Sequence, residues 1–310
     1  MQLDVVVAFF ILGLLARSLN ARIDFPAGLY QGIIIFLLLA IGLKGGVALN
    51  AHGSAAVVPQ ALAVLAIGLL MPFIAFPLLL KVGELSRENA ASIAAHYGSV
   101  SIGTYAVAVS FLESAGIPYE PYFPLFVAIL EIPAIAVGVW LARRSNVQLD
   151  TRKVLHEVFL NQGVLLLVGG LAIGWLWGAR TATIMPLFTD LFQGALALFL
   201  LQMGMVAADK VGVLRQYGSF IASFAVFMPL VGALIGAVTG QALGLSAGGV
   251  MLLATLAASS SYIAVPAAMA VAVPAANQSL SITASLAVTF PFNVLVGIPL
   301  YVALVGRMMA

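Results

Sequence analysis

The sequence has 310 residues, of which 63% are hydrophobic and 8% are charged, and its formal net charge is +2. An ordinary soluble domain has about 25% charged residues, so this composition indicates an integral membrane protein surrounded by lipid. The small net charge gives no support for a nucleic-acid partner. The absence of cysteine excludes disulfides, thiolate nucleophiles and cysteine-ligated metals.

Apolar runs of about 20 residues are long enough to cross a bilayer, and the chain contains ten of them. They lie at residues 3–19, 26–43, 55–80, 89–114, 120–142, 155–178, 184–206, 214–239, 246–272 and 278–305. The first run has no basic residue before it and is followed by Arg17 and Arg22, which is typical of a retained span rather than a cleaved signal peptide. We therefore predict an all-α membrane protein with ten transmembrane helices.

Basic residues predict the orientation of these spans. With the N-terminus outside, the cytoplasmic connections contain Arg17, Arg22, Lys81, Arg87, Arg143, Arg144, Arg152, Lys153, Lys210 and Arg215, whereas the other side has Lys44, Arg180 and Arg307. Because cytoplasmic loops carry the excess of Lys and Arg, both termini are expected outside the cytoplasmic (inner) membrane. The basic loop 143–153 is a topology anchor in this interpretation; a docking site for a cytosolic regulator is the alternative.

This loop divides the chain into residues 1–148 and 149–310, each with five predicted spans. GLKGGVALN (42–50) corresponds to LQMGMVAAD (201–209), and HYGSVSIGTY (96–105) corresponds to AASSSYIAVP (257–266), both with an offset of about 160 residues. Because five is odd, the second half begins on the opposite side of the membrane. The sequence therefore predicts a 5+5 inverted-topology repeat, an architecture common among secondary transporters.

The fourth and ninth spans contain glycine, serine and proline where an unbroken helix would be expected. Backbone in lipid must be hydrogen-bonded within a helix unless it lines a cavity or is buried in protein, so we predict that each span is two half-helices. Their N-terminal ends, together with nearby hydroxyls, suit a small anion. The candidate anion-site residues are Gly98, Ser99, Ser101, Gly103, Thr104, Ser259, Ser260 and Ser261. The alternative is that these small residues only allow close helix packing.

A family resemblance spans nearly the whole chain. It rests on LKGGVAL, GSVSIGTYAVAVSFLESAGIPYE running into LEIPAI, LLQMGMVA, and GGVMLLATLAASSSYIAVPAAMAVAVPAANQS. In this order the segments resemble the sodium-dependent bicarbonate transporters of the cyanobacterial SbtA type. The resemblance implies a homotrimeric, elevator-like carrier with a gate domain and a mobile core domain. It also implies that sodium entry drives bicarbonate uptake, with bicarbonate bound between the broken centres of spans four and nine.

Two features depart from that family. Tyr262 stands where the family tends to have an acidic residue, which removes a carboxylate useful for sodium. The family's cyanobacterial members also have a much longer central loop than 143–153 and are regulated by a PII-like protein. The resemblance thus implies a PII-like partner, and the short loop argues against one.

The candidate cation ligands are Glu131, Thr289 and Asn293. Glu131 lies near the middle of span five, where an unpaired carboxylate is costly, so we expect it to bind sodium or accept a proton unless it pairs with a buried base. Thr289 and Asn293 are four residues apart on one helix face and offer neutral oxygens or a helix–helix hydrogen bond. Apart from sodium as the coupling ion, we expect no metal or cofactor.

The sequence does not have the motifs of an enzyme. A zinc-protease motif, a nucleophile elbow and a phosphate loop are absent, and no paired His and Asp accompanies an intramembrane serine. We predict a secondary active transporter for sodium-coupled bicarbonate uptake. The alternatives are a sodium- or proton-coupled symporter of another small anion, such as a short carboxylate, and a passive anion channel.

Overall fold

The computed structural model describes residues 4–21, 23–143, 156, 160–214 and 218–309, and every regular element in these ranges is a helix. Seven described helical segments are long and apolar enough to cross a membrane. They are Ala27–His52, Val57–Val82, Phe123–Ala142, Gln162–Thr183, Met185–Lys210, Gly218–Ala242 and Gln278–Met308. The predicted all-helical membrane class is confirmed, although fewer than ten single helices have the required length.

The other three predicted spans consist of shorter helices. The first is α1 (Val5–Ser18), which Asp4 caps by accepting a hydrogen bond from the Val6 N–H at 3.1 Å. The fourth is α4 (Arg87–Gly98) followed by α5 (Ile102–Ser114), and the ninth is α13 (Ala247–Ala258) followed by α14 (Ala264–Ala272). The chain thus leaves the helix at 99–101 and 259–263, where glycine and serine predicted a break.

A third interruption, which was not predicted, divides the fifth span. Helix α6 (Phe123–Leu130) ends before Glu131, and α7 (Pro133–Ala142) begins after Ile132. Pro133 has no N–H group to donate to the preceding turn, and its fixed φ suits the first position of a helix. The proline therefore explains why the helix restarts at this point.

The remaining spans are longer. They are α2 (Ala27–His52), α3 (Val57–Pro77) continued by η1 (Leu78–Val82), α9 (Gln162–Trp177) continued by η2 (Gly178–Thr183), α10 (Met185–Asp190), α11 (Phe192–Leu214) and α12 (Gly218–Ala242). The last span runs through α15 (Gln278–Ile282), η3 (Thr283–Thr289), α16 (Phe290–Phe292), η4 (Asn293–Gly297) and α17 (Ile298–Met308). Its η3 and η4 turns, like η1, are π-helical.

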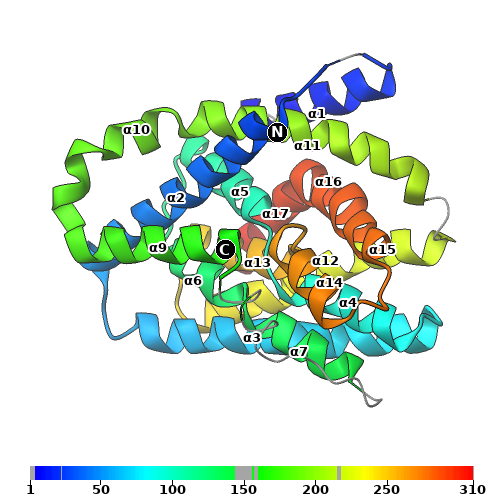
Figure 1. The fold of residues 1–310 in the computed structure, drawn as a ribbon. Helices are drawn as coiled ribbons and strands as arrows, with labels where there is room; N and C mark the ends of the chain where they lie inside the picture. Colours follow the sequence, from blue (N-terminus) through cyan, green and yellow to red (C-terminus); the bar gives the residue numbers. More distant parts are fainter. Residues whose placement is uncertain (1–3, 22, 144–155, 157–159, 215–217, 310) are drawn as a thin grey trace.

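Two groups of helices can be distinguished by their packing. Helix α1 lies along α11, and α2 lies along α9, with α10 beside α2. We call these five helices the frame; in Figure 1, α1 and α11 cross the top while α2, α9 and α10 lie on the left. Helices α3–α7 and α12–α17 form the core group, in which α4 packs on α3 and α7, and α12 packs on α13. Both broken spans therefore belong to the core group.

Glycine allows the frame helices to cross closely. In α2 and α9, a Cβ atom at Gly46 would collide with the Leu171 carbonyl oxygen, and one at Gly174 would collide with the Leu43 carbonyl oxygen. The spacing of Gly42 and Gly46, and of Gly170 and Gly174, gives each helix a small-xxx-small stripe at the crossing. The two frame helices are therefore held by backbone contact that larger side chains would prevent.

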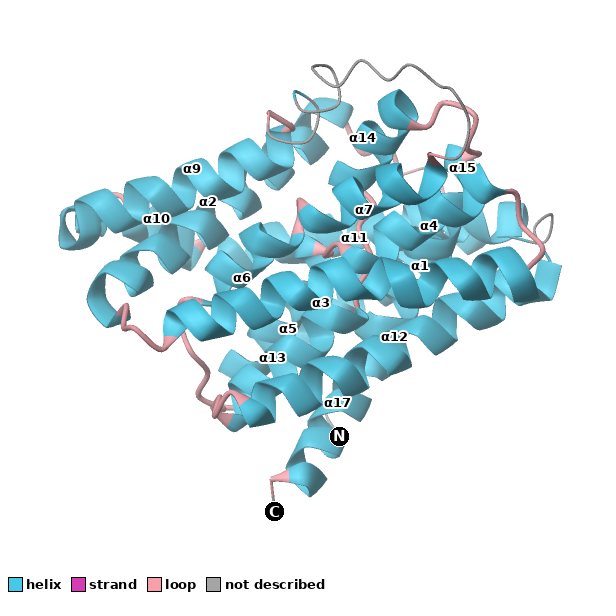
Figure 2. Cartoon of the chain, turned by 90° about the horizontal axis from the view of Figure 1, so that it is seen from below, coloured by secondary structure: helices cyan, strands magenta, loops and turns pink. Residues whose placement is uncertain are grey.

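Connections lie mainly at the ends of the helices and at the breaks (Figure 2). Of the predicted topology anchor at 143–153, residues 144–153, with Arg144, Arg152 and Lys153, lie outside the described residues, as do Arg22 and Arg215. The boundary at 148 and 149 between the predicted halves lies there too.

Candidate functional site

The two breaks in the core group lie against each other. The Ser101 N–H donates to Ser259 Oγ at 3.0 Å, and the Ser261 N–H donates to the His96 carbonyl oxygen at 2.9 Å. These bonds join segments that are about 160 residues apart in the chain. The serine clusters of the fourth and ninth spans therefore form one polar region at the centre of the core group.

Helix α5 begins in this region with backbone N–H donors that have no acceptor within the helix. Ser101 caps the helix, because its Oγ accepts from the Thr104 N–H at 3.1 Å and from Thr104 Oγ1 at 2.9 Å. The N–H groups of Ile102 and Gly103 come before the first intrahelical bond, so they have no acceptor within α5. Together with the helix dipole, they place partial positive charge at the break.

The three serines of the second break have different partners. Ser259 Oγ donates to the Leu256 carbonyl oxygen at 2.8 Å and accepts from the Ser101 N–H, so this hydroxyl is engaged within the protein. Ser261 Oγ accepts from the Val265 N–H of α14 at 3.4 Å. Ser260 is buried, and its Oγ has no hydrogen-bond partner in the part of the chain that the structure describes. Ser260 is therefore the serine of this break whose hydroxyl remains for a ligand.

The two predicted glycines of the first break have different surroundings. A Cβ at Gly98 would collide with Pro72 and Ala134, so Gly98 packs against α3 and α7. A Cβ at Gly103 would lie 2.6 Å from Tyr262 Oη and 2.7 Å from Phe199 Cε1. Gly103 thus brings the start of α5 close to both rings, whereas Gly98 serves close helix packing.

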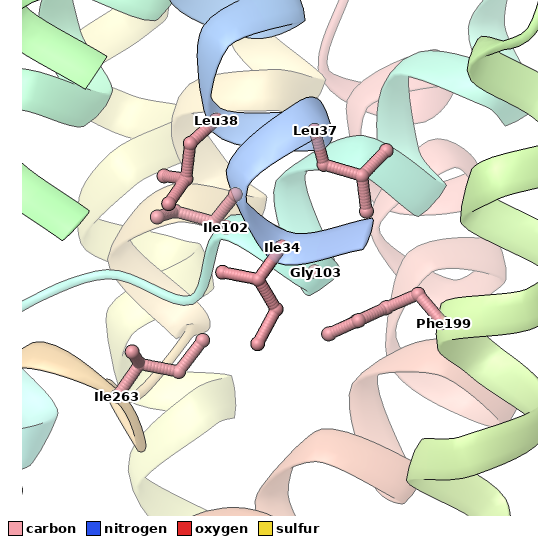
Figure 3. A pocket seen from close by; sticks show the side chains of 7 residues that line it. All are labelled: Ile34, Leu37, Leu38, Ile102, Gly103, Phe199 and Ile263. Carbon is pink, nitrogen blue, oxygen red and sulfur yellow. The ribbon is translucent and has the colours of Figure 1, made fainter. Parts of the chain in front are cut away.

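A small cavity adjoins the breaks (Figure 3). It is lined by Ile34, Leu37, Leu38, Ile102, Gly103, Phe199 and Ile263. In Figure 3, Ile34 and Phe199 of the frame extend toward Ile263 of the second break. The frame thus presents an apolar wall to the polar region. Electrostatic interactions are stronger where water is excluded.

Glu131 lies beside the first break. Its carboxylate accepts a long hydrogen bond from Ser99 Oγ, at 3.4 Å, and the residue is 1% exposed. The one ion pair found among the described residues joins Arg17 and Asp209, so Glu131 has no basic partner there. The structure therefore brings together two of the predicted polar residues, Ser99 and Glu131.

Thr289 and Asn293 form hydrogen bonds elsewhere. Thr289 Oγ1 donates to the Ala225 carbonyl oxygen at 2.7 Å and lies 2.7 Å from the Tyr97 hydroxyl. Asn293 Nδ2 donates to the Ala258 carbonyl oxygen at 2.9 Å, and Asn293 Oδ1 accepts from Tyr301 at 2.7 Å. These contacts join the last span to its neighbours, and in the described chain no hydrogen bond links either residue to Glu131.

Glu120, the glutamate of the IPYE segment, has a structural role that was not predicted from the sequence. Glu120 accepts from the Ser246 N–H at 2.7 Å and from Ser246 Oγ at 3.1 Å, at the N-terminus of α13. In the other half, Asn89 Oδ1 near the start of α4 accepts from the Asn277 N–H at 2.7 Å. Each loop that follows a broken span therefore closes over the first half-helix of the other broken span. The sequence feature that could have predicted this contact is the acidic residue Glu120 directly after the turn segment IPY.

Tyr119 lies beside this loop contact. Its hydroxyl donates to Glu113 Oε1 at 3.1 Å. Burial and the neighbouring Glu113 carboxylate raise the pKa of Tyr119 above its usual value.

Comparison with known families gives one match. A family model described as the Na+-dependent bicarbonate transporter superfamily matches residues 5–306. No curated protein matches the chain.

Proposed function

Because the chain belongs to the Na+-dependent bicarbonate transporter superfamily, we propose that it couples sodium entry to bicarbonate uptake across the cytoplasmic membrane. Family membership makes the chain a transporter rather than an enzyme. The structural observation that carries the proposed mechanism is the crossing of the two breaks, held by Ser101 with Ser259 and by Ser261 with His96.

The crossing supplies the chemistry that a small anion needs. Helices α5 and α14 both begin there, so two positive dipole ends approach one place, and the N–H groups of Ile102 and Gly103 have no acceptor within α5. The hydroxyl of Ser260 adds a neutral donor. Bicarbonate carries a single negative charge, which these partial charges balance without a fully charged basic residue that would hold the anion too tightly to release it.

A cation must accompany the anion. Moving one negative charge against an interior-negative potential costs about 2.3 kcal/mol per 100 mV, so one sodium makes the movement electroneutral and two let the potential drive uptake. Glu131 supports a cation site next to the anion, because Ser99 links its carboxylate to the first break. We propose that sodium binds at Glu131 with hydroxyl and carbonyl oxygens of this region.

The packing also supports the ten-span inverted repeat. The first predicted span of each half lies along the second span of the other half, as α1 with α11 and α2 with α9, which is the exchange that a pseudo-twofold axis produces. In the proposed elevator the core group carries the anion site past the frame. By resemblance the assembly is a homotrimer, and by the positive-inside rule both termini face outside.

The test uses purified protein in proteoliposomes. Uptake of labelled bicarbonate at alkaline pH is measured with an inward sodium gradient, with equal sodium on both sides, and with potassium instead. The proposal expects uptake that accumulates only with the gradient and that shows counterflow. Ser260→Leu places a large side chain at the free hydroxyl and serves as the folded, inactive control.

Other outcomes have distinct meanings. Uptake that ignores every cation gradient and shows no counterflow would make the chain a passive anion channel. Uptake that follows a pH gradient without sodium would make it proton-coupled. Uptake of a labelled short carboxylate, with no uptake of bicarbonate, would make the short carboxylate the substrate.

A further inference from the structure

Tyr262 has a buried hydroxyl that the mechanism above does not use. The residue directly follows Ser261 in the second break, and its ring packs edge-on against Phe290, with centroids 5.3 Å apart. Tyr262 Oη is inaccessible to solvent and has no hydrogen-bond partner in the described part of the chain. Buried tyrosine hydroxyls are usually hydrogen-bonded, so an unbonded one calls for a ligand or another explanation.

The hydroxyl reaches from the second break to the first. A Cβ built on Gly103 would lie 2.6 Å from Tyr262 Oη, and the side chain of Ser101 is also near enough to interact with it. The oxygen therefore lies at the start of α5, where the N–H groups of Ile102 and Gly103 have no acceptor in the helix. Gly103 also lines the small cavity between the breaks and the frame (Figure 3).

A second unbonded hydroxyl supports a ligand at this place. Ser260 is 2% exposed, and its Oγ is also without a partner among the described residues. Two buried hydroxyls and the first turn of a 13-residue helix thus supply donors at the crossing of the breaks. Directional donors on more than one side suit an anion with several oxygen atoms better than a spherical halide.

We propose that the Tyr262 hydroxyl binds the transported anion by donating a hydrogen bond to one of its oxygens at the start of α5. The substrate class is therefore a small oxyanion. This inference rests on the proposed function, since it places the anion at the same crossing. Tyr262 acts as a binding residue that determines specificity, and its contact with Phe290 fixes the direction of the hydroxyl.

The test is Tyr262→Phe, which removes the oxygen and keeps the ring that packs on Phe290. A hydrogen bond to a charged ligand contributes enough that we expect the apparent KM for bicarbonate to rise about 10-fold or more, with little change in maximal rate. The concentration of sodium for half-maximal uptake should stay the same. Tyr30→Phe is the matched control, because the Tyr30 ring stacks on Phe199 and, among the described residues, the hydrogen bond found for its hydroxyl is to Met203 Sδ, at 3.9 Å.

An unchanged KM in Tyr262→Phe would overturn the inference, whether or not the melting temperature falls. A change in sodium dependence alone would also overturn it, because the hydroxyl would then serve the cation. If wild-type protein takes up no bicarbonate, the proposed function fails first. Thermal stabilisation of the protein by bicarbonate, nitrate and formate then tests anion binding directly. Stabilisation of the wild type that is lost in Tyr262→Phe supports the inference. Equal stabilisation of both proteins contradicts it.

Discussion

Glu131 is 1% exposed, and its carboxylate accepts a 3.4 Å hydrogen bond from Ser99 Oγ. Such a group inside a membrane protein either takes up a proton or binds a cation, because an unpaired charge there costs several kcal/mol. The neighbouring break suggests that this choice is linked to transport. Glu131 is therefore the residue whose charge we expect to matter most.

We predict that Glu131→Gln lowers sodium-stimulated bicarbonate uptake at least about 10-fold, because glutamine keeps an oxygen but loses the charge that attracts the cation. Protein yield and thermal stability should change little, since a neutral amide is easier to bury than a carboxylate. Uptake with and without a sodium gradient measures the effect. Glu84→Gln, at an exposed position, is the control. Unchanged sodium stimulation in Glu131→Gln would make the carboxylate structural.

The sequence predicted which residue types gather at the breaks, but not which of them are free. Ser259 and Ser260 are adjacent and identical in type, yet one hydroxyl has two partners and the other has none in the described structure. Their difference depends on the rotation of the chain after it leaves α13. A pattern of serines holds no information about that rotation.

At the scale of the helices, close crossings depend on glycines with matched spacing. Gly174 of α9 faces the backbone of α2 at Leu43 and Val47. Gly169 of the same helix has no atom within 4 Å of the position of its missing Cβ. The two glycines therefore form a natural pair for a packing experiment, because alanine improves helix propensity equally at both.

We predict that Gly174→Ala destabilises the protein by roughly 1 to 3 kcal/mol, because the added methyl group forces α2 and α9 apart. Gly169→Ala should leave stability unchanged or raise it slightly. Melting temperatures in detergent measure both effects. Equal melting temperatures for the two variants would show that the α2–α9 crossing tolerates separation.

Helices could be predicted from the sequence more accurately than irregular turns. Gly98, the serines and Pro266 gave sufficient reason to expect the two breaks. Pro133 carried the same kind of signal for the interruption after Glu131, but the strongly apolar residues around it indicated one span. Pro291 lies between the π-helical turns η3 and η4 and is a local signal of an irregular helix. It does not say where an extra residue is accommodated, because tertiary packing determines that position.

At the scale of the whole molecule, polar contacts join the frame to the core group. Ser110 Oγ of α5 lies 2.8 Å from Asp4 Oδ2 before α1 and 3.0 Å from Gln193 Oε1 of α11. If the core group slides along the frame, these contacts must separate in each transport cycle. By contrast, Arg17 and Asp209 pair within the frame, between α1 and α11, at 2.6 Å.

We predict that a cross-link between Ser110→Cys and Gln193→Cys arrests uptake, because it ties the moving group to the stationary one. The chain has no native cysteine, so a short thiol-specific cross-linker acts only at the introduced pair. Labelled uptake is measured before treatment, after cross-linking, and after release with a reducing agent.

The matched control is the pair Arg17→Cys and Asp209→Cys, whose cross-link stays within the frame and should leave uptake near its starting value. Full uptake by the cross-linked Ser110–Gln193 pair would contradict the elevator. Arrest by both cross-links would mean that the frame itself must move.

The proposed division into two five-span halves rests on the sequence, but the pairing of helices across that division could not be predicted from it. The repeat was inferred from GLKGGVALN and from the serine clusters, which give the offset along the chain. The structure adds that each frame helix pairs with a helix of the other half. Glycines at Gly42, Gly46, Gly170 and Gly174 allowed such a crossing, but glycine stripes do not identify their partners.

The exchanged pairing of α1 with α11 also has a consequence for biosynthesis. Arg17 and Asp209 are 192 residues apart, so a ribosome that adds roughly 5 to 20 residues per second needs about 10 to 40 s between them. During that interval α1 and α2 are already in the bilayer while the faces that contain Gly13 and Gly46 meet lipid instead of their partner helices. The closest contacts of α1 and α2 can therefore form only after α11 and α9 have been made, when more than half of the chain has been translated.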